Sequence, residues 1–228
     1  FASQFKSNLI AIGRTNKEEL HDFINLEKTN KNISYYQVNV SNESEICEFF
    51  KEIKNKYSRL DGCIHAAGVV KPNFLVNKEY REFEESLNPK TVGIQLLDKY
   101  IQMNHFNLDF FVSFSSISSV FPEFTGALTD YATANYFLDQ FSLYKQSQKQ
   151  PYSSINWGPW SKTGMSQNDM FLKQLETKGI FPLDPNEALS YLDATIMKSP
   201  NNIIITHKSD VKNQVGALVI EVIGQMPS

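Results

Sequence analysis

The stretch LDFFVSFSSISSVFPEFTGALTDYATAN, residues 108–135, decides the fold. It opens with an apolar run of strand length that closes in a cluster of serines, and we expect a buried strand over 109–114. Residues 130–148 are expected to form a helix on which Tyr131 and Asn135 share one face, because residues four apart are neighbours there. The serines would therefore meet these two side chains from an adjacent element.

The same alternation of short apolar runs and longer helical patterns continues on both sides of this stretch. It predicts βαβ units, and hence an α/β fold with a doubly wound parallel sheet of the Rossmann type. The expected strands are 8–12, 34–38, 62–66, 109–114, 153–157 and 202–206. The last residues, 215–228, are expected to be either a final strand or the start of a linker.

Local signals indicate where the helices begin and end. Asn42 with Glu45 three residues later predicts an N-cap and a capping box for a helix over 44–57. Pro89 is expected to separate two helices and to keep Asn88 out of the helical conformation. Pro185 fits the first turn of a later helix, where its missing N–H costs little.

Composition excludes several classes of protein. The 228 residues fit one large domain, 1–228, and 41% hydrophobic with 21% charged residues is typical of a globular chain. A net charge of −3 offers no basic surface for nucleic acid, and the longest apolar runs fall far short of the roughly 20 residues that cross a bilayer. Cys47 and Cys63 have no spacing for a metal site or a disulfide framework, which favours a reducing, cytoplasmic location.

Candidate ligand contacts follow from the position of the strands. In an open parallel sheet, ligands bind outside the carboxyl ends of the strands. A turn of small residues such as Ala66-Ala67-Gly68 lets a flat ligand approach the backbone, and the planar guanidinium of Arg14 suits the 2′-phosphate of NADP. The residues that directly follow the apolar runs are Gly13, Arg14, Asn39, Ala66, Ala67, Gly68, Ser115, Ser116, Gly158, Pro159 and Trp160.

Six motifs in order resemble the ketoreductase domains of modular polyketide synthases, which are complex-type members of the short-chain dehydrogenase/reductase superfamily. They are IGR (12–14), HAAGV (65–69), NPKTVG (88–93), LDFFVSFSS (108–116), YATANYFLD (131–139) and INWGPW (155–160). The resemblance implies a catalytic tetrad of Lys90, Ser116, Tyr131 and Asn135. It also implies NADPH as the cofactor, bound at Gly13, Arg14, Asn39, Val40, Ala66, Ala67, Gly68, Pro159 and Trp160.

The implied reaction reduces a β-ketoacyl thioester on an acyl carrier protein, within a chain that carries neighbouring synthase domains. Tyr131 would donate the proton, and a nearby ammonium, Lys90, would lower the pKa of this phenol and hold the nicotinamide ribose. Ser116 would donate to the substrate carbonyl, and Asn135 would hold a water or the lysine in a proton relay. A stand-alone dehydrogenase of the superfamily would carry lysine, not asparagine, at position 135.

Each of these residues also has a structural interpretation. Serines after a strand commonly satisfy turn backbone, a tyrosine at a helix start is often a core residue, and a lysine such as Lys90 is often a solvated charge. His65 is expected to be structural, and Trp157 and Trp160 fit the core as well as a nicotinamide site. The ordered set of motifs, more than any single residue, favours the enzyme.

The sequence departs from the family pattern at several places. The G-x-G-x-x-G turn is absent and would lie immediately before Phe1, so we expect a segment of a longer polypeptide that lacks the first strand of the fold. Asn39 replaces the usual Asp. Fourteen residues separate Ser116 from Tyr131, about two more than is common, which leaves open whether Ser115 or Ser116 is the donor.

Three further points bear on function. Val70-Lys71-Pro72 replaces the Leu-Asp-Asp of B-type domains, and the A-type tryptophan is missing, so the hand of the product is unassigned. Residues 161–175 resemble the mobile lid of these enzymes, with Gly164 as a source of mobility. A non-catalytic ketoreductase-like scaffold in a megasynthase is the alternative that the missing glycine turn favours.

Overall fold

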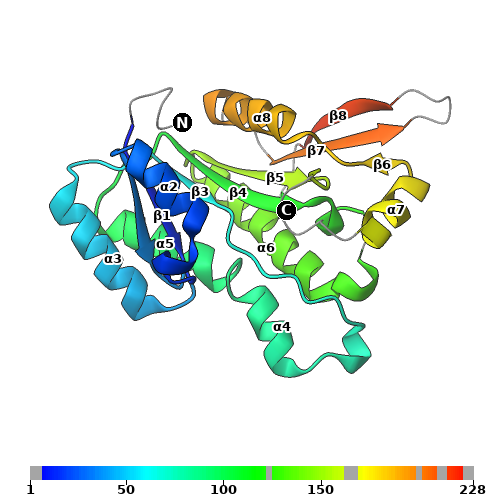
Figure 1. Cartoon of the computed structure of the whole chain (residues 1–228), viewed down its shortest axis with the longest axis horizontal. Coiled ribbons are helices and arrows are strands. Elements are labelled where there is room, and N and C mark those ends of the chain that lie inside the picture. Colours follow the sequence, from blue (N-terminus) through cyan, green and yellow to red (C-terminus); the bar gives the residue numbers. More distant parts are fainter. Residues whose placement is uncertain (1–6, 122–124, 162–168, 199–201, 210–214, 223–228) are drawn as a thin grey trace. The chain divides into compact units, whose positions relative to one another are not determined.

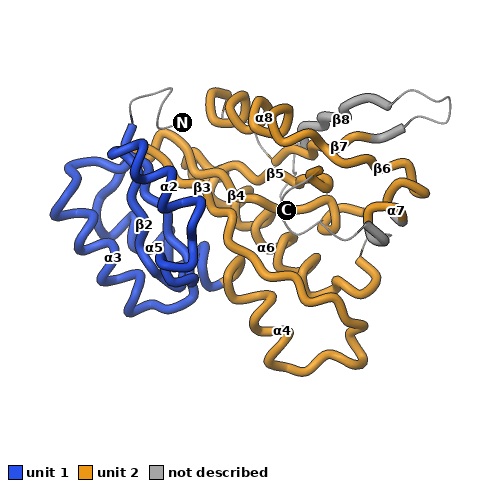
Figure 2. Tube along the Cα trace, viewed as in Figure 1, with its two compact units in different colours: residues 1–60, 92–107 blue, residues 61–91, 108–228 orange. Residues whose placement is uncertain are grey.

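The computed structural model describes residues 7–121, 125–161, 169–198, 202–209 and 215–222. The chain divides into two compact units, each described here by itself (Figure 2). Unit 1 comprises residues 1–60 and 92–107, and unit 2 comprises residues 61–91 and 108–228.

Unit 1 is built on two parallel strands. β1 (Leu9–Gly13) pairs with β2 (Ile33–Gln37), so that Gly13 lies opposite Gln37 and both strands end at the same edge. Three helices accompany them: α2 (His21–Thr29), α3 (Glu43–Lys56) and α5 (Val92–Met103). The core of this unit combines buried aliphatic residues such as Ile46 and Ile94 with an aromatic pair, in which Phe50 of α3 stacks on Tyr100 of α5 with 6.1 Å between ring centroids.

The start of α3 confirms the predicted N-cap but changes the capping box. The Asn42 side chain accepts hydrogen bonds from the backbone N–H groups of Ser44 and Glu45, as an N-cap residue does. Glu45 does not reach back to the Asn42 backbone in the predicted way. Its carboxylate accepts instead from the Asn39 N–H at 2.7 Å and from Asn42 Nδ2 at 2.7 Å. The helix start therefore also fixes the turn that follows β2.

Unit 2 contains a six-stranded, mostly parallel sheet with strand order β3-β4-β5-β7-β6, and β8 pairs with β7 (Figure 1). The parallel strands are β3 (Gly62–His65), β4 (Phe110–Ser116), β5 (Tyr152–Trp157) and β7 (Asn202–Ser209). β6 (Ile180–Phe181) and β8 (Val215–Val222) are antiparallel to β7. All six predicted strands are present, each paired in parallel with another of the six, and 215–222 is a strand rather than a linker.

Four helices belong to unit 2: α4 (Tyr80–Leu87), α6 (Thr129–Ser147), α7 (Asp169–Thr177) and α8 (Pro185–Lys198). Pro185 opens α8, as predicted. The break at Pro89 is also where it was expected, but Asn88 keeps helical angles of φ −55° and ψ −41° and its N–H bonds to Glu84, so that detail of the prediction was wrong. Residues 162–168, which hold Gly164 and much of the expected lid, lie outside the described residues.

The two faces of β5 show why the sheet carries both a core and a polar site. Successive side chains of a strand point to opposite faces. Ile155 and Trp157 pack in the apolar cluster with Leu192 of α8. Ser154 and Asn156, which alternate with them, hydrogen-bond to Asp139 of α6 on the other face. The helices cover both faces, which is the doubly wound arrangement that the sequence predicted. No helix in the described part of the chain is long and apolar enough to cross a bilayer.

Candidate active site

Unit 2 brings the four residues of the predicted tetrad together. Ser116 is the last residue of β4, Tyr131 and Asn135 lie in the first turns of α6, and Lys90 follows α4. Lys90 Nζ lies 5.7 Å from the centroid of the Tyr131 ring. The Ser116 and Asn135 side chains lie close enough to the Tyr131 hydroxyl to act on its pKa. An ammonium, a phenol, a hydroxyl and an amide therefore surround one point at the carboxyl end of β4.

Lys90 is a buried cation, not a solvated surface charge. Only 2% of the residue is exposed, and Nζ donates to the backbone carbonyl of Phe114 at 2.6 Å. Burial lowers the pKa of Lys90 to about 8, and the negative charge of Asp139 opposes this shift. His65, at the end of β3, is also 2% exposed. Burial lowers the pKa of its imidazole to about 3, so the ring is neutral at pH 7. His65 is thus the structural histidine that the sequence predicted.

The pKa of Tyr131 contradicts the expected direction. We predicted that the nearby ammonium would lower it, but desolvation outweighs the hydrogen bonds from Asn135 and Ser116, and the pKa of the phenol is raised. Burial could not be estimated from the sequence around Tyr131. The consequence is that the phenol keeps its proton at neutral pH, as a proton donor must.

The register of β4 separates Ser115 from Ser116. The Ser115 hydroxyl is 4% exposed, donates to the backbone carbonyl of Asn135 at 3.2 Å and accepts from Asn156 Nδ2 at 3.1 Å. The Ser116 hydroxyl accepts from the Ser118 N–H at 3.2 Å and contacts the Tyr131 hydroxyl. Successive residues of a strand point to opposite sides, and the structure places Ser116 at the phenol.

Asn135 is completely buried, and only one of the two polar atoms of its side chain has a hydrogen-bond partner. Its Nδ2 donates to the backbone carbonyl of Tyr131 at 2.7 Å, while its Oδ1 has no hydrogen-bond partner. A buried polar atom without a partner is unfavourable by about 1–3 kcal/mol, so an unmet acceptor beside the phenol calls for an explanation.

The predicted cofactor contacts fall into two sets, one in each unit. In unit 1, Gly13 and the exposed Arg14 follow β1, and Asn39 with the buried Val40 follows β2, its parallel neighbour. In unit 2, Ala66, Ala67 and Gly68 follow β3, and Pro159 and Trp160 follow β5. Each set lies at the carboxyl ends of its strands. Trp160 packs edge-on against Trp157, with ring centroids 5.1 Å apart. Its side chain therefore contacts the apolar core as well as lying at a strand end.

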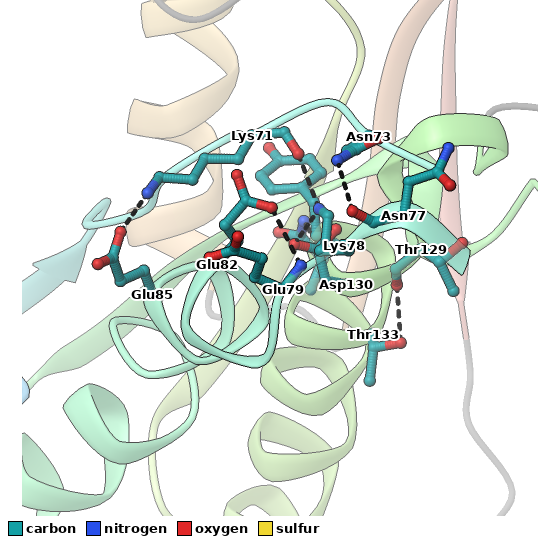
Figure 3. A network of polar contacts seen from close by, with 12 residues as sticks. Lys71, Asn73, Asn77, Lys78, Glu79, Glu82, Glu85, Thr129, Asp130 and Thr133 are labelled. Carbon is teal, nitrogen blue, oxygen red and sulfur yellow. Dashed lines mark hydrogen bonds and ion pairs between the residues drawn. The ribbon is translucent and has the colours of Figure 1, made fainter. Parts of the chain in front are cut away.

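Asp130, the residue directly before Tyr131, forms an ion pair that the sequence did not reveal. Lys78 Nζ lies 2.5 Å from Asp130 Oδ2, and both side chains are 1% exposed (Figure 3). The ammonium also donates to the backbone carbonyl of Lys71 at 2.7 Å. Burial acts to raise the pKa of the Asp130 carboxyl, but the interaction with Lys78 helps to outweigh burial and the pKa is lowered overall. The pair joins the segment after β3 to the first turn of α6, directly next to Tyr131. Its members are 52 positions apart in sequence, which hides the pair from local patterns.

Asp139 is a second residue that sequence reasoning missed. It lies one turn beyond Asn135 on α6 and is 7% exposed. A carboxylate two turns after Tyr131 on the same helical face was the available signal. Among the described residues no group of three His, Cys, Asp or Glu side chains is placed to hold a metal ion.

Comparison with known proteins assigns the family. The profile of the KR domain matches residues 1–162. The chain belongs to the KR domain family. It is a ketoreductase domain of the kind found in modular polyketide synthases, and an oxidoreductase by family. Relatives with the same domain include polyketide synthase PksN of Bacillus subtilis (strain 168), 30% identical over 187 residues that cover 79% of this chain and 3% of that protein.

Other similar proteins agree with this assignment. Polyketide synthase ThaG of Burkholderia thailandensis is 30% identical over 77% of the chain and 3% of its own length. Among solved structures, a ketoreductase domain from the bacillaene assembly line superposes with a TM-score of 0.79 at 28% identity, covering 90% of this KR chain and 51% of that one. The chain thus spans about 3% of these curated relatives and about half of this solved structure.

Proposed function

We propose that this KR domain is an NADPH-dependent β-ketoacyl reductase that acts on thioesters carried by an acyl carrier protein. The observation that carries the proposal is the geometry in unit 2: the Tyr131 hydroxyl contacts Ser116, and the buried ammonium of Lys90 lies over its ring. Reduction of a ketone needs a proton donor at the oxygen while hydride reaches the carbon. The family and the site agree on that chemistry.

Tyr131 is the proton donor in this proposal, because burial keeps its phenol protonated. Ser116 donates a hydrogen bond to the same carbonyl oxygen and stabilises the negative charge that develops there. The C=O bond becomes C–O–H with the phenolic proton, and the hydride ends on the carbon. NADPH, when bound, supplies that hydride and leaves as NADP⁺.

Lys90 stabilises the phenolate that Tyr131 becomes after it has given up its proton. An ammonium without a bulk-water shell interacts strongly with a nearby anion, and Lys90 is 2% exposed. Asn135 supports the return of the proton, since its unpaired Oδ1 offers an acceptor for a bound water beside Tyr131. The relay keeps the phenol ready for the next cycle.

Cofactor contacts are proposed for each unit by itself, from the residues at its strand ends. Arg14, exposed directly after β1, fits a phosphate through its fork of N–H donors. Asn39 fixes its own turn by accepting from the Ser41 N–H at 3.1 Å. Ala66, Ala67 and Gly68 leave room beside the backbone for a flat ring. The substrate carrier and the neighbouring synthase domains are proposed from the relatives, all of which are far longer than this chain.

Turnover by the complete gene product tests the proposal. A β-ketoacyl thioester of N-acetylcysteamine, a short mimic of the carrier's thioester, is incubated with NADPH, and loss of nicotinamide absorbance is followed. Tyr131→Phe should lower kcat about 10²–10⁴-fold, the range for loss of a general acid. Tyr136→Phe is the matched control, because Tyr136 is 54% exposed on the same helix and its substitution should leave turnover unchanged.

Two results would contradict this function. Unchanged turnover in Tyr131→Phe would remove the proposed acid. Absence of turnover and of NADPH binding in the wild-type gene product would favour the non-catalytic scaffold instead.

A further inference from the structure

Asp139 is the centre of a buried hydrogen-bond cluster. Its carboxylate accepts from Ser154 Oγ at 2.6 Å and from Asn156 Nδ2 at 2.7 Å, both on β5. Ser119 Oγ lies 2.7 Å from its Oδ2. Three hydrogen-bonding partners on one carboxylate compensate for the water that an anion loses when it is buried.

The cluster reaches the backbone of the proposed carbonyl donor. Ser119 Oγ, which contacts Asp139, also lies 2.8 Å from the backbone carbonyl of Ser116. Asn156 Nδ2 lies 2.7 Å from Ser119 Oγ and 3.4 Å from that same carbonyl. The turn that carries Ser116 is thus held from two sides by groups that bind Asp139.

The charge of Asp139 acts on Lys90. The two residues are 7% and 2% exposed, and in such surroundings Coulomb interactions are screened far less than in water. The attraction raises the pKa of Lys90 against the effect of burial, while burial raises the pKa of Asp139 itself.

Other titratable groups lie near this pair. His65 of β3 and Tyr131 of α6 face Lys90, and both are neutral at pH 7 because burial lowers the pKa of the imidazole and raises that of the phenol. On α6 itself, Lys145 Nζ lies over the rings of Phe141 and Tyr152, 5.9 and 5.4 Å from their centroids. The groups that meet the Asp139 carboxylate from β5 and from the turn after β4 are the uncharged Ser154, Asn156 and Ser119 already described.

From these hydrogen bonds we infer that Asp139 is a positioning residue for the proposed reduction: it fixes the turn that presents Ser116, and its buried charge also acts on Lys90. The inference rests on the proposed function for its kinetic consequence. Asp139 touches neither the substrate nor the reacting atoms. It acts through Ser119, Asn156 and the field at Lys90.

The consequence is a specific change in pH dependence. Asp139→Asn removes the negative charge while nearly preserving the shape of the side chain. Without the anion, both Lys90 and Tyr131 lose their protons more easily, so the alkaline limb of the kcat/KM profile moves to lower pH whichever of the two governs it. The ratio of variant to wild-type kcat/KM should fall at least about threefold further between pH 7 and pH 9. A merely structural defect would lower the ratio equally at each pH.

Two further variants make the kinetic test specific. Asp139→Glu keeps the charge but displaces the carboxylate, so it should lower the rate and leave the alkaline limb in place. Asp193→Asn, on α8 and partly exposed, should leave both the rate and the profile unchanged. A profile for Asp139→Asn that keeps the wild-type limb would overturn the inference.

A second measurement does not depend on turnover. Urea unfolding of the wild type, Asp139→Asn, Lys90→Met and the double variant forms a double-mutant cycle. If the two charges interact, Asp139→Asn destabilises the protein with Lys90 more than the protein with Met at position 90. Additive effects of the two substitutions on the free energy of unfolding would contradict an interaction between the two charges. Coupling in this cycle without any reductase activity would refute the proposed function and leave the Asp139–Lys90 interaction standing.

Discussion

Replacing Lys90 by methionine tests whether the buried charge of Lys90 lowers the free energy of unfolding. Lys90 is 2% exposed, and its Nζ has one backbone acceptor, the carbonyl of Phe114. A methionine of similar length fills the same space without a charge. We expect Lys90→Met to lose reductase activity. We also expect its free energy of unfolding to depend on pH differently from that of the wild type.

The magnitude follows from the pKa of Lys90, which burial lowers from 10.5 to about 8. Between these two values the unfolded chain holds a proton that the folded chain has released, so the free energy of unfolding of the wild type rises with pH. The gap of about 2.5 pH units corresponds to about 3 kcal/mol over the whole window, with on the order of 1 kcal/mol gained by pH 9. Lys90→Met has no such gain.

The assay is urea unfolding of both proteins at pH 7, 8 and 9, followed by the fluorescence of Trp157 and Trp160, which both lie in unit 2. Other groups that titrate in this range are common to both proteins and cancel in the difference. The stability of Lys90→Met relative to the wild type should therefore decline by about 1 kcal/mol from pH 7 to pH 9. A difference that is flat with pH would refute the burial argument for Lys90.

Three other substitutions test separate parts of the structure. In Gly158→Ala a Cβ would lie 2.4 Å from Thr206 Oγ1 and 3.1 Å from its Cα, so the free energy of unfolding should fall by about 1–3 kcal/mol in urea titrations. Asp130→Asn leaves the Lys78 ammonium buried without its counter-charge and should destabilise the protein by about 3–5 kcal/mol in the same assay. Arg14→Ala should raise the KM for NADPH about tenfold in steady-state kinetics while leaving the KM for NADH unchanged.

Each of these has a control or a contradicting result. Gly126→Ala, where a Cβ would meet nothing within 4 Å, should be far milder than Gly158→Ala, and equal effects would show that the close approach to Thr206 is not what matters. Lys78→Met combined with Asp130→Leu should recover much of the stability that Asp130→Asn loses. An equal rise in KM for both nucleotides would show that Arg14 does not recognise the 2′-phosphate.

The features that the sequence predicted well are local. Apolar runs and helical spacing placed the six strands, and Asn42 and Pro185 marked two helix starts because a cap and a proline act within one turn. The tetrad was predicted from motifs, and the structure brings Lys90, Ser116, Tyr131 and Asn135 together. β6 has two residues and leaves no pattern, and periodicity does not say which strand β8 pairs with.

The features that the sequence did not predict depend on burial and on distant pairing. The pKa of Tyr131 is raised because desolvation exceeds the hydrogen bonds it receives, a balance that only the packed structure sets. The choice between Ser115 and Ser116 required the register of β4 against β5 and α6. Lys78 with Asp130, and Asp139 with its donors on β5, are charges buried by partners far away in sequence, where a lone residue resembles a surface one.

Transfer of a labelled hydride tests the central claim most directly. The complete gene product is supplied with a β-ketoacyl thioester and with NADPH that carries deuterium at one or the other C4 position, and the product is examined by mass spectrometry. We predict that one of the two labelled forms places deuterium on the hydroxyl-bearing β-carbon, and that this product is lost in Tyr131→Phe and kept in Tyr136→Phe. A β-hydroxyacyl product without deuterium from either form, or equal labelling with and without the Tyr131 hydroxyl, would contradict the account.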